Sequence, residues 1–139
     1  MLLRRAADPA ELPLVLGYYS LAHGVIDSSL ARKHFPTAKL PAYPLGVALI
    51  GRLAVDSRCQ GRGLGELLVV DALLRATLAA TQLAGVGVVV DAKDEPLVRF
   101  YGRFGFARLA EADASWPRRL FLRASDIEVA LGRQSPSHP

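Results

Sequence analysis

The stretch Gln60-Gly61-Arg62-Gly63-Leu64-Gly65 decides the fold of this chain. It places glycine at three alternate positions between an apolar segment, Val47–Val55, and a leucine-rich segment that begins at Leu64. Glycine allows tight turns and a close approach of the backbone to a ligand, and the first amides of a helix have no partner within it. A strand, a glycine loop and a helix in this order therefore predict a site for a phosphate or pyrophosphate.

Two other phosphate-binding motifs do not match the loop. A P-loop requires a lysine and then a serine or threonine after its second glycine, whereas Gly65 is followed by Glu66 and Leu67. The dinucleotide-binding fingerprint requires a glycine at its sixth position, where this chain has Glu66. The spacing excludes both motifs, and Glu66 is expected to face solvent.

Strand-like and helix-like segments alternate on both sides of the loop. The expected strands are Leu2–Arg5, Leu14–Ala22, Val47–Val55, Val86–Asp91, Phe106–Leu109 and Leu120–Arg123. The expected helices are Leu64–Gln82, Glu95–Phe104 and Ser125–Leu131, with one further turn at Ser28–Lys33 inside a loop of residues 23–44. This order predicts an α/β arrangement in which a central strand leads into a helix through glycines.

The helix predicted over Leu64–Gln82 is the clearest element. A helical wheel places one apolar side on it, formed by Leu67, Val70, Leu74 and Leu78. Asp71 and Arg75 lie on another side, at the spacing of an ion pair. Asp94 is the expected N-cap of the following helix.

The composition is that of a globular protein with one domain. The chain has 139 residues, of which 51% are hydrophobic and 22% charged, so we expect one domain over residues 1–131 and a disordered tail over 132–139. No apolar run has the length of a membrane span, and the first residues do not form a secretory signal. The single cysteine fits a reducing compartment, which predicts a cytoplasmic protein.

Arginine supplies most of the positive charge. The net charge is +4, and fourteen of the seventeen basic residues are arginine, whose guanidinium suits phosphate groups. An anionic cofactor, RNA or an acidic protein would each match this charge, and so would a surface charged only for solubility. The sequence has no basic run with interleaved aromatic residues, so it does not indicate a dedicated nucleic-acid reader.

Two motifs give the chain a resemblance to the GNAT acetyltransferases. Gln60–Gly65 is similar to the acetyl-CoA loop of that family, and Phe100-Tyr101-Gly102-Arg103-Phe104-Gly105-Phe106 is similar to its second signature. The resemblance implies a GNAT-like acyl-CoA N-acyltransferase fold, with a mixed, mostly antiparallel sheet flanked by helices. It also implies acetyl-CoA as the cosubstrate, with no metal.

Three segments resemble the toxin-type branch of this family, namely Leu16–Leu21, Gly51–Asp56 and Gln60–Gly65. Members of that branch are encoded with an antitoxin and acetylate the α-amine of aminoacyl-tRNA, which stops translation. The resemblance covers about Leu14–Leu131 and implies a ribbon-helix-helix antitoxin as a partner.

The resemblance also assigns roles to particular residues. Tyr101 matches the tyrosine that donates a proton to the departing thiolate. The backbone of Leu53, Ala54 and Val55 matches the strand end that binds the pantetheine arm and polarises the thioester carbonyl. The remaining cofactor-binding residues are Gln60, Gly61, Arg62, Gly63, Leu64 and Gly65, and a Cβ atom added at Gly63 or Gly65 is expected to impair binding most.

The family pattern begins with one strand and two helices that this sequence is expected to lack. Three functions therefore stay open at this point. They are an aminoacyl-tRNA-acetylating toxin, a GNAT enzyme that acetylates a small amine or a protein N-terminus, and a truncated, non-catalytic remnant that binds CoA or antitoxin. A homodimer is also expected, because an apolar surface exposed where those helices would pack favours association.

Overall fold

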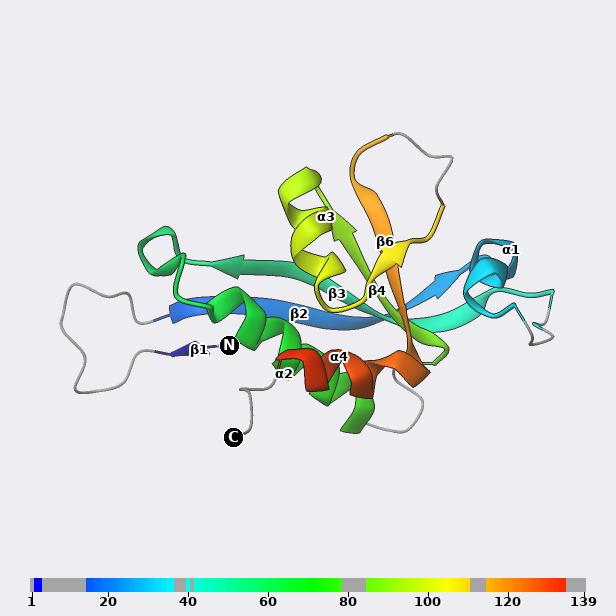
Figure 1. The fold of residues 1–139 in the computed structure, drawn as a ribbon, viewed down its shortest axis with the longest axis horizontal. Coiled ribbons are helices and arrows are strands. Elements are labelled where there is room, and N and C mark those ends of the chain that lie inside the picture. The colour runs from blue at the N-terminus through cyan, green and yellow to red at the C-terminus, as the bar shows by residue number, and fades with distance from the viewer. Residues whose placement is uncertain are drawn as a thin grey trace.

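A computed structural model describes residues 2–3, 15–36, 40, 42–78, 85–110 and 115–134. In these residues a six-stranded sheet has the order β1-β2-β3-β4-β6-β5 (Figure 1). The strands are β1 (Leu2–Leu3), β2 (Val15–Ile26), β3 (Leu45–Val55), β4 (Gly87–Ala92), β5 (Ala107–Arg108) and β6 (Arg118–Arg123). Only β3 and β4 pair in parallel, which confirms the mixed, mostly antiparallel sheet.

The α-helices of the described residues are α1 (Ser28–Ala31), α2 (Leu64–Leu78), α3 (Glu95–Gly102) and α4 (Ile127–Gln134). Helix α2 connects β3 to its parallel neighbour β4, as a crossover helix must. Helices α2 and α4 lie side by side, and α3 lies against β4 and β6 (Figure 1).

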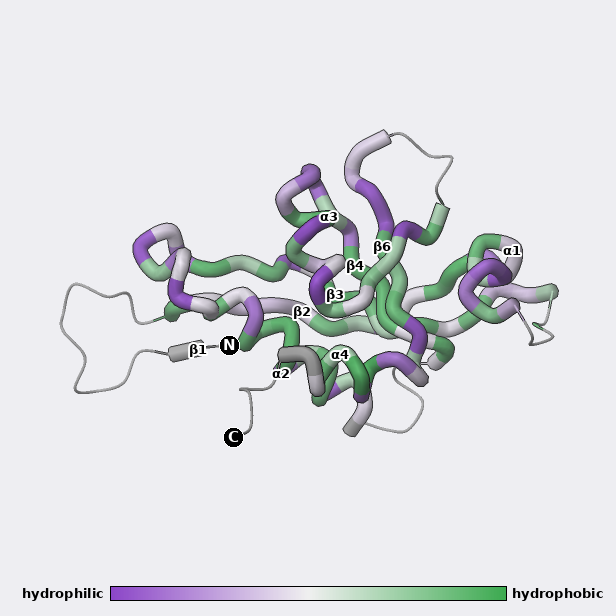
Figure 2. The backbone as a smooth tube through the Cα atoms, in the orientation of Figure 1, coloured by the Kyte–Doolittle hydropathy of each residue, from purple (hydrophilic) through white to green (hydrophobic). Residues whose placement is uncertain are grey.

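Two apolar cores lie on opposite faces of the sheet. The larger core joins α2, α3 and α4 to strand residues such as Ile50 and Val90. The smaller core joins Ala31 of α1 to Val47, Val89 and Phe121, the alternate residues of the same strands. Figure 2 shows the middle of β3 and β4 as hydrophobic, with hydrophilic residues gathered around α1 and in the turn after β3.

Strand β2 is longer than the sequence predicted. It continues from Ala22 through His23 and Gly24 to Ile26, in residues that were predicted to be a loop. The extension pairs with the first half of β3, with Gly24 opposite Val47 and Ile26 opposite Leu45. The local turn signal of His23-Gly24 is therefore overridden by pairing with a neighbouring strand, which no local pattern reveals.

The buried side of α2 also differs from the prediction. Leu67 and Leu74 are 54% and 41% exposed, whereas the residues that face the core are Leu68, Val69, Ala72, Leu73 and Ala76. The helix carries apolar residues on most of its circumference, so its periodicity alone could not select the face that meets the sheet. The predicted ion pair on its other side is confirmed, with 3.0 Å between Arg75 Nε and Asp71 Oδ2.

Other boundaries move by a few residues. Helix α3 ends at Gly102 instead of Phe104, β6 begins at Arg118 instead of Leu120, and α4 extends to Gln134, beyond the predicted end at Leu131. The predicted N-cap is confirmed, because the Asp94 carboxylate accepts a hydrogen bond from the Leu97 amide at 3.1 Å. Residues 4–5, 14, 79–82 and 135–139 of the predicted elements lie outside the described residues.

No helix in the described parts of the chain is both long enough and apolar enough to cross a membrane.

Adjacent leucines of α2 give a matched test of this packing. Leu73 is fully buried and Leu74 is 41% exposed. Leu73→Ala is expected to lower the free energy of unfolding by about 3 kcal/mol, because it leaves a cavity in the core. Leu74→Ala is expected to cost less than about 1 kcal/mol. Urea denaturation measures both values, and equal losses would contradict the assignment of the buried face.

Candidate functional site

The site begins where two parallel strands separate. Strands β3 and β4 pair over only three residues each, from Ala48 opposite Val88 to Ile50 opposite Val90. Both strands continue beyond these pairs, β3 as far as Val55 and β4 as far as Ala92. In the described residues no strand pairs with this edge of Gly51–Val55. The backbone groups of that edge therefore face a gap instead of a neighbouring strand.

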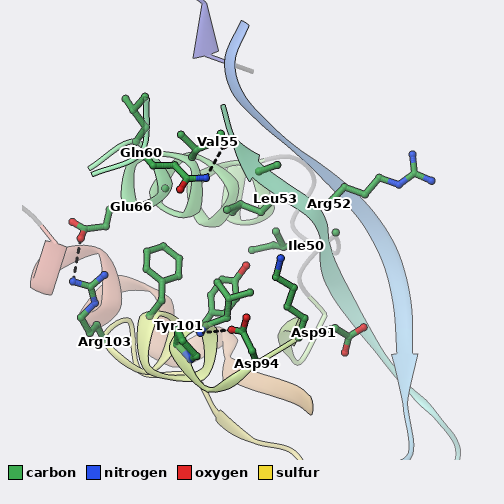
Figure 3. Close-up of a pocket in the computed structure, with 18 of the residues that line it drawn as sticks. Ile50, Arg52, Leu53, Val55, Gln60, Glu66, Asp91, Asp94, Tyr101 and Arg103 are labelled. Atoms are coloured by element: carbon green, nitrogen blue, oxygen red, sulfur yellow. Dashed lines mark hydrogen bonds and ion pairs between the residues drawn. The ribbon is translucent and has the colours of Figure 1, made fainter. Parts of the chain in front are cut away.

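A bulge in β3 accompanies the separation. Tyr18 of β2 lies opposite Ala54 and Ser20 lies opposite Gly51, so two residues of β3 face one residue of β2. Arg52, one of these two residues, has a left-handed backbone with φ of 51°. Its side chain points away from Tyr101 (Figure 3). A bulge bends a strand and increases its twist, which accounts for the departure of β3 from β4.

The glycine loop follows β3 as the sequence predicted. Gly61 and Gly63 have left-handed φ values of 82° and 75°, which glycine adopts without the steric cost that a side chain brings. The Gln60 side-chain amide donates to the Val55 carbonyl oxygen at 3.3 Å and ties the loop to the strand end (Figure 3). The main chain is thus turned sharply between β3 and α2.

The amino end of α2 offers free backbone donors. The amide of Leu67 donates to the Gly63 carbonyl at 3.2 Å, so the amides of Leu64, Gly65 and Glu66 come before the first bond of the helix. These amides, together with the positive end of the helix dipole, suit a phosphate or pyrophosphate.

A cavity of about 830 Å³ joins the gap to the loop. Its volume is within the usual range for small-molecule sites. The structure brings together at this cavity almost all the predicted site residues: Leu53, Ala54, Val55, Gln60, Gly61, Gly63, Leu64, Gly65 and Tyr101. The exception is Arg62, which is exposed and outside the cavity lining. Arg58 also lies outside the lining and pairs with Asp56 at 3.3 Å.

Tyr101 reaches the cavity from α3. The residue is only 5% exposed, and its ring packs edge-on against Phe100 and Phe106, with centroids 5.1 and 5.7 Å away. Within the described residues no group forms a hydrogen bond with its hydroxyl. Burial raises the pKa of Tyr101 to about 12, so the hydroxyl is protonated at neutral pH. The arrangement supplies one neutral proton donor beside the gap.

Several charged residues around the cavity form ion pairs. Glu66, predicted to face solvent, forms an ion pair with Arg103 at 3.2 Å and so links the start of α2 to the end of α3 (Figure 3). Asp91 forms a two-point ion pair with Arg119 of β6, at 2.9 and 3.0 Å. Paired charges of this kind hold the rim of the cavity without adding net charge to it.

Asp91 and Lys93 are polar residues of the lining that the sequence motifs did not point to. Both lie at or just after the carboxyl end of β4. Ligands of α/β sheets bind at the carboxyl ends of parallel strands, and polar residues directly after a buried strand were therefore a usable signal. Cys59 also lines the cavity, as a buried free thiol.

These features fit an acyl-CoA in three ways. The unpaired edge of Gly51–Val55 offers backbone groups to an amide-containing arm. The amides at the start of α2 offer donors to a pyrophosphate. The Tyr101 hydroxyl lies at the cavity between these elements and α3. In the described residues no group of three or more His, Cys, Asp or Glu side chains could hold a metal ion.

Comparison with known proteins gives consistent results. The family model described as acetyltransferase (GNAT) domain matches residues 22–108. A tRNA-acetylating toxin of Mycobacterium tuberculosis is 34% identical over 122 residues, which cover 85% of this chain and 68% of the toxin.

Two solved structures of the toxin AtaT have a similar fold. AtaT complexed with acetyl-methionyl-tRNAfMet has a TM-score of 0.68 and 28% identity, and the match covers 82% of this chain and 65% of AtaT. An AtaT mutant bound to acetyl-CoA and to the C-terminus of the antitoxin AtaR has a TM-score of 0.59 and 28% identity, covering 84% and 65%. This chain therefore spans about two thirds of the length of these relatives.

The loop geometry revises the expected effect of glycine substitutions. Gly63 has a left-handed φ of 75°, whereas Gly65 does not, and a Cβ atom on Gly65 would meet Phe100 Cζ at 3.4 Å, an ordinary contact. Gly63→Ala is expected to raise the Kd for CoA about tenfold, because alanine disfavours this backbone by about 1–2 kcal/mol. Gly65→Ala is expected to raise it about threefold or less. Isothermal titration calorimetry measures both values, and a larger effect at Gly65 would contradict the prediction.

Proposed function

Because this chain belongs to the GNAT acetyltransferase family, we propose that it acetylates the α-amine of aminoacyl-tRNA with acetyl-CoA and so stops translation as a toxin. The observation that carries the proposal is the buried residue Tyr101, which lines the same cavity as the separated strands and the glycine loop. The named relatives support charged tRNA as the acceptor.

The donor would be bound mainly by backbone groups. The free edge of Leu53, Ala54 and Val55 would bind the pantetheine arm and orient the thioester carbonyl. The amides at the start of α2 would hold the pyrophosphate, with Gly61 and Gly63 shaping the turn. Backbone binding explains why Arg62 can lie outside the lining, since the loop contributes its main chain and not that side chain.

The sulfur that leaves in this reaction must receive one proton. When bound, acetyl-CoA supplies a thioester whose carbonyl carbon bonds to the acceptor nitrogen while its C–S bond breaks. The Tyr101 hydroxyl gives a proton to the sulfur and regains one from solvent, and the acceptor nitrogen loses one proton to solvent. A thiol has a pKa of about 8.5, so this assistance contributes a limited factor, toward the lower end of general-acid catalysis.

A strong general base is unnecessary. A free α-amine has a pKa of about 7.7–8.0, and the amine of an aminoacyl ester is no more basic, so neutral amine is present at pH 7. Tyr101 cannot be this base, because its pKa of about 12 keeps it protonated. Activation of the acceptor therefore depends on its own titration and on its position at the gap.

We further propose a ribbon-helix-helix antitoxin as a partner, a homodimer, and the cytoplasm as the location. The AtaT complex with the C-terminus of AtaR supports an antitoxin in general. Exposed apolar side chains on the adjacent helices α2 and α4 support association, with Leu67 and Val129 each 54% exposed. The proposed acceptor, charged tRNA, fits a location in the cytoplasm.

Acetylation of charged tRNA by the full chain tests the function. With labelled acetyl-CoA, the wild type is expected to transfer acetyl to charged but not to uncharged tRNA. Tyr101→Phe is expected to lower kcat about 100-fold, because it removes the proton donor and leaves the ring in place. Tyr19→Phe is the matched control: burial and a hydrogen bond to Asp71 raise the pKa of Tyr19 to about 12 as well, but Tyr19 lies outside the cavity lining.

Each other outcome of this assay has a definite meaning. Transfer to polyamines or peptide N-termini without transfer to charged tRNA would replace the proposed acceptor class. Binding of CoA with no transfer to any amine would identify a non-catalytic remnant. An equal loss of activity in Tyr19→Phe and Tyr101→Phe would argue against a specific role for Tyr101.

The pH dependence gives an independent check. Below the pKa of the acceptor amine, kcat/KM is expected to rise about tenfold per pH unit, because only the neutral amine reacts. It is then expected to stay level to pH 9, because Tyr101, with a pKa of about 12, loses its proton only at much higher pH. Initial rates between pH 6 and 9 measure the profile, and a decline below pH 9 would exclude Tyr101 as the donor.

A further inference from the structure

The only tryptophan of the chain, Trp116, lies just before β6. Trp116 is 41% exposed, and the Arg118 guanidinium carbon lies 4.0 Å from its ring centroid. Stacking on the guanidinium fixes the ring as a flat surface at low entropic cost. Exposed aromatic rings backed by arginine are the surfaces on which single-stranded nucleic acids stack their bases.

Arg118, on which the ring stacks, is connected to two segments that line the cavity. Arg118 lies opposite Ala92, the last residue of β4, and donates to Glu95 at the first position of α3, at 3.1 Å. Pro96 and Lys93, the neighbours of these two residues, line the cavity. In Figure 1 the start of β6 and the end of β4 lie beside α3.

Lys93 is the cation of this rim that could meet an anion. The carboxylates here are engaged: Asp91 with Arg119, Asp94 with the Leu97 amide, and Glu95 with Arg118. Lys93 is exposed at the cavity, and within the described residues its ammonium has no partner. This cation is therefore available at the cavity for a phosphate.

We propose that Trp116 and Lys93 form a subsite for the unpaired 3′ end of the acceptor RNA. A nucleobase stacks on the indole ring, and Lys93 pairs with a backbone phosphate next to the aminoacylated nucleotide. The inference rests on the proposed function, since the reactive amine of aminoacyl-tRNA is attached to this unpaired end. Through these contacts, Trp116 and Lys93 distinguish an RNA-linked amine from a free one.

Tryptophan fluorescence tests the subsite without any turnover. Trp116 is the only tryptophan, so its emission reports directly on this position. An RNA minihelix with an unpaired CCA 3′ end is expected to quench the emission, and the same minihelix without these three nucleotides is not. Lys93→Gln is expected to weaken the quenching titration and to lower its dependence on salt. Equal quenching by both minihelices, or quenching by neither, would overturn the proposal.

Kinetics then separate the subsite from the chemistry. Trp116→Ala is expected to raise KM for charged tRNA about tenfold, equal to about 1.4 kcal/mol, whereas Trp116→Phe keeps a stacking ring and most of the affinity. Both variants are expected to leave transfer to an amino acid methyl ester, which has no nucleotides, within about twofold of wild type. Tyr43→Ala is the matched control, because Tyr43 is an aromatic residue 68% exposed and outside the cavity lining.

The remaining outcomes distinguish failure of the subsite from failure of the function. If quenching of the wild type requires the unpaired 3′ end but the wild type acetylates no charged tRNA, the RNA site is retained and the proposed reaction is rejected. Normal acetylation with unchanged KM in Trp116→Ala would reject the subsite and keep the function. Loss of antitoxin binding in Trp116→Ala with unchanged KM for tRNA would assign the ring to a protein contact and overturn the inference.

Discussion

The brief parallel pairing of β3 with β4 is the constraint on which the rest of the structure depends. Three residues of each strand hold the centre of the sheet together, and beyond Ile50 and Val90 the strands separate. A closed ladder would satisfy every backbone group of Gly51–Val55 and leave no room between the strands. Because β3 bulges at Arg52, the same strand is core at one end and a binding surface at the other.

The helices complete the site because they are anchored in the core. Val69 and Leu73 of α2 and Phe104 after α3 are almost fully buried in the same cluster. This packing fixes the loop amides at the start of α2 and the Tyr101 hydroxyl on α3, while the Glu66–Arg103 ion pair joins the two helices at the rim. Rigid supports of this kind let a site that consists largely of main-chain groups keep its geometry.

The two halves of the proposed site use different chemistry. The donor half consists of backbone groups and one tyrosine, so its specificity comes from the path of the chain. The proposed acceptor half, where β4 ends and β6 begins, consists of side chains: Lys93 in the cavity lining, and the stacked pair of Trp116 and Arg118. Recognition by backbone groups suits a donor that many enzymes share. Recognition by side chains suits the choice of one acceptor among several.

The sequence by itself determined the glycine loop, the helix after it, the N-cap at Asp94 and the position of Tyr101 in its motif, because local spacing and backbone conformation set these features. Only the tertiary structure decided that Leu68 and Leu73 of α2 face the core instead of Leu67 and Leu74, and that β2 continues to Ile26. It also decided that the end of β4 and the start of β6 meet beside the cavity. The physical reason is that burial and strand pairing depend on neighbours that are distant in the chain. In a helix that is apolar on most sides, the local sequence pattern does not indicate which side those neighbours will cover.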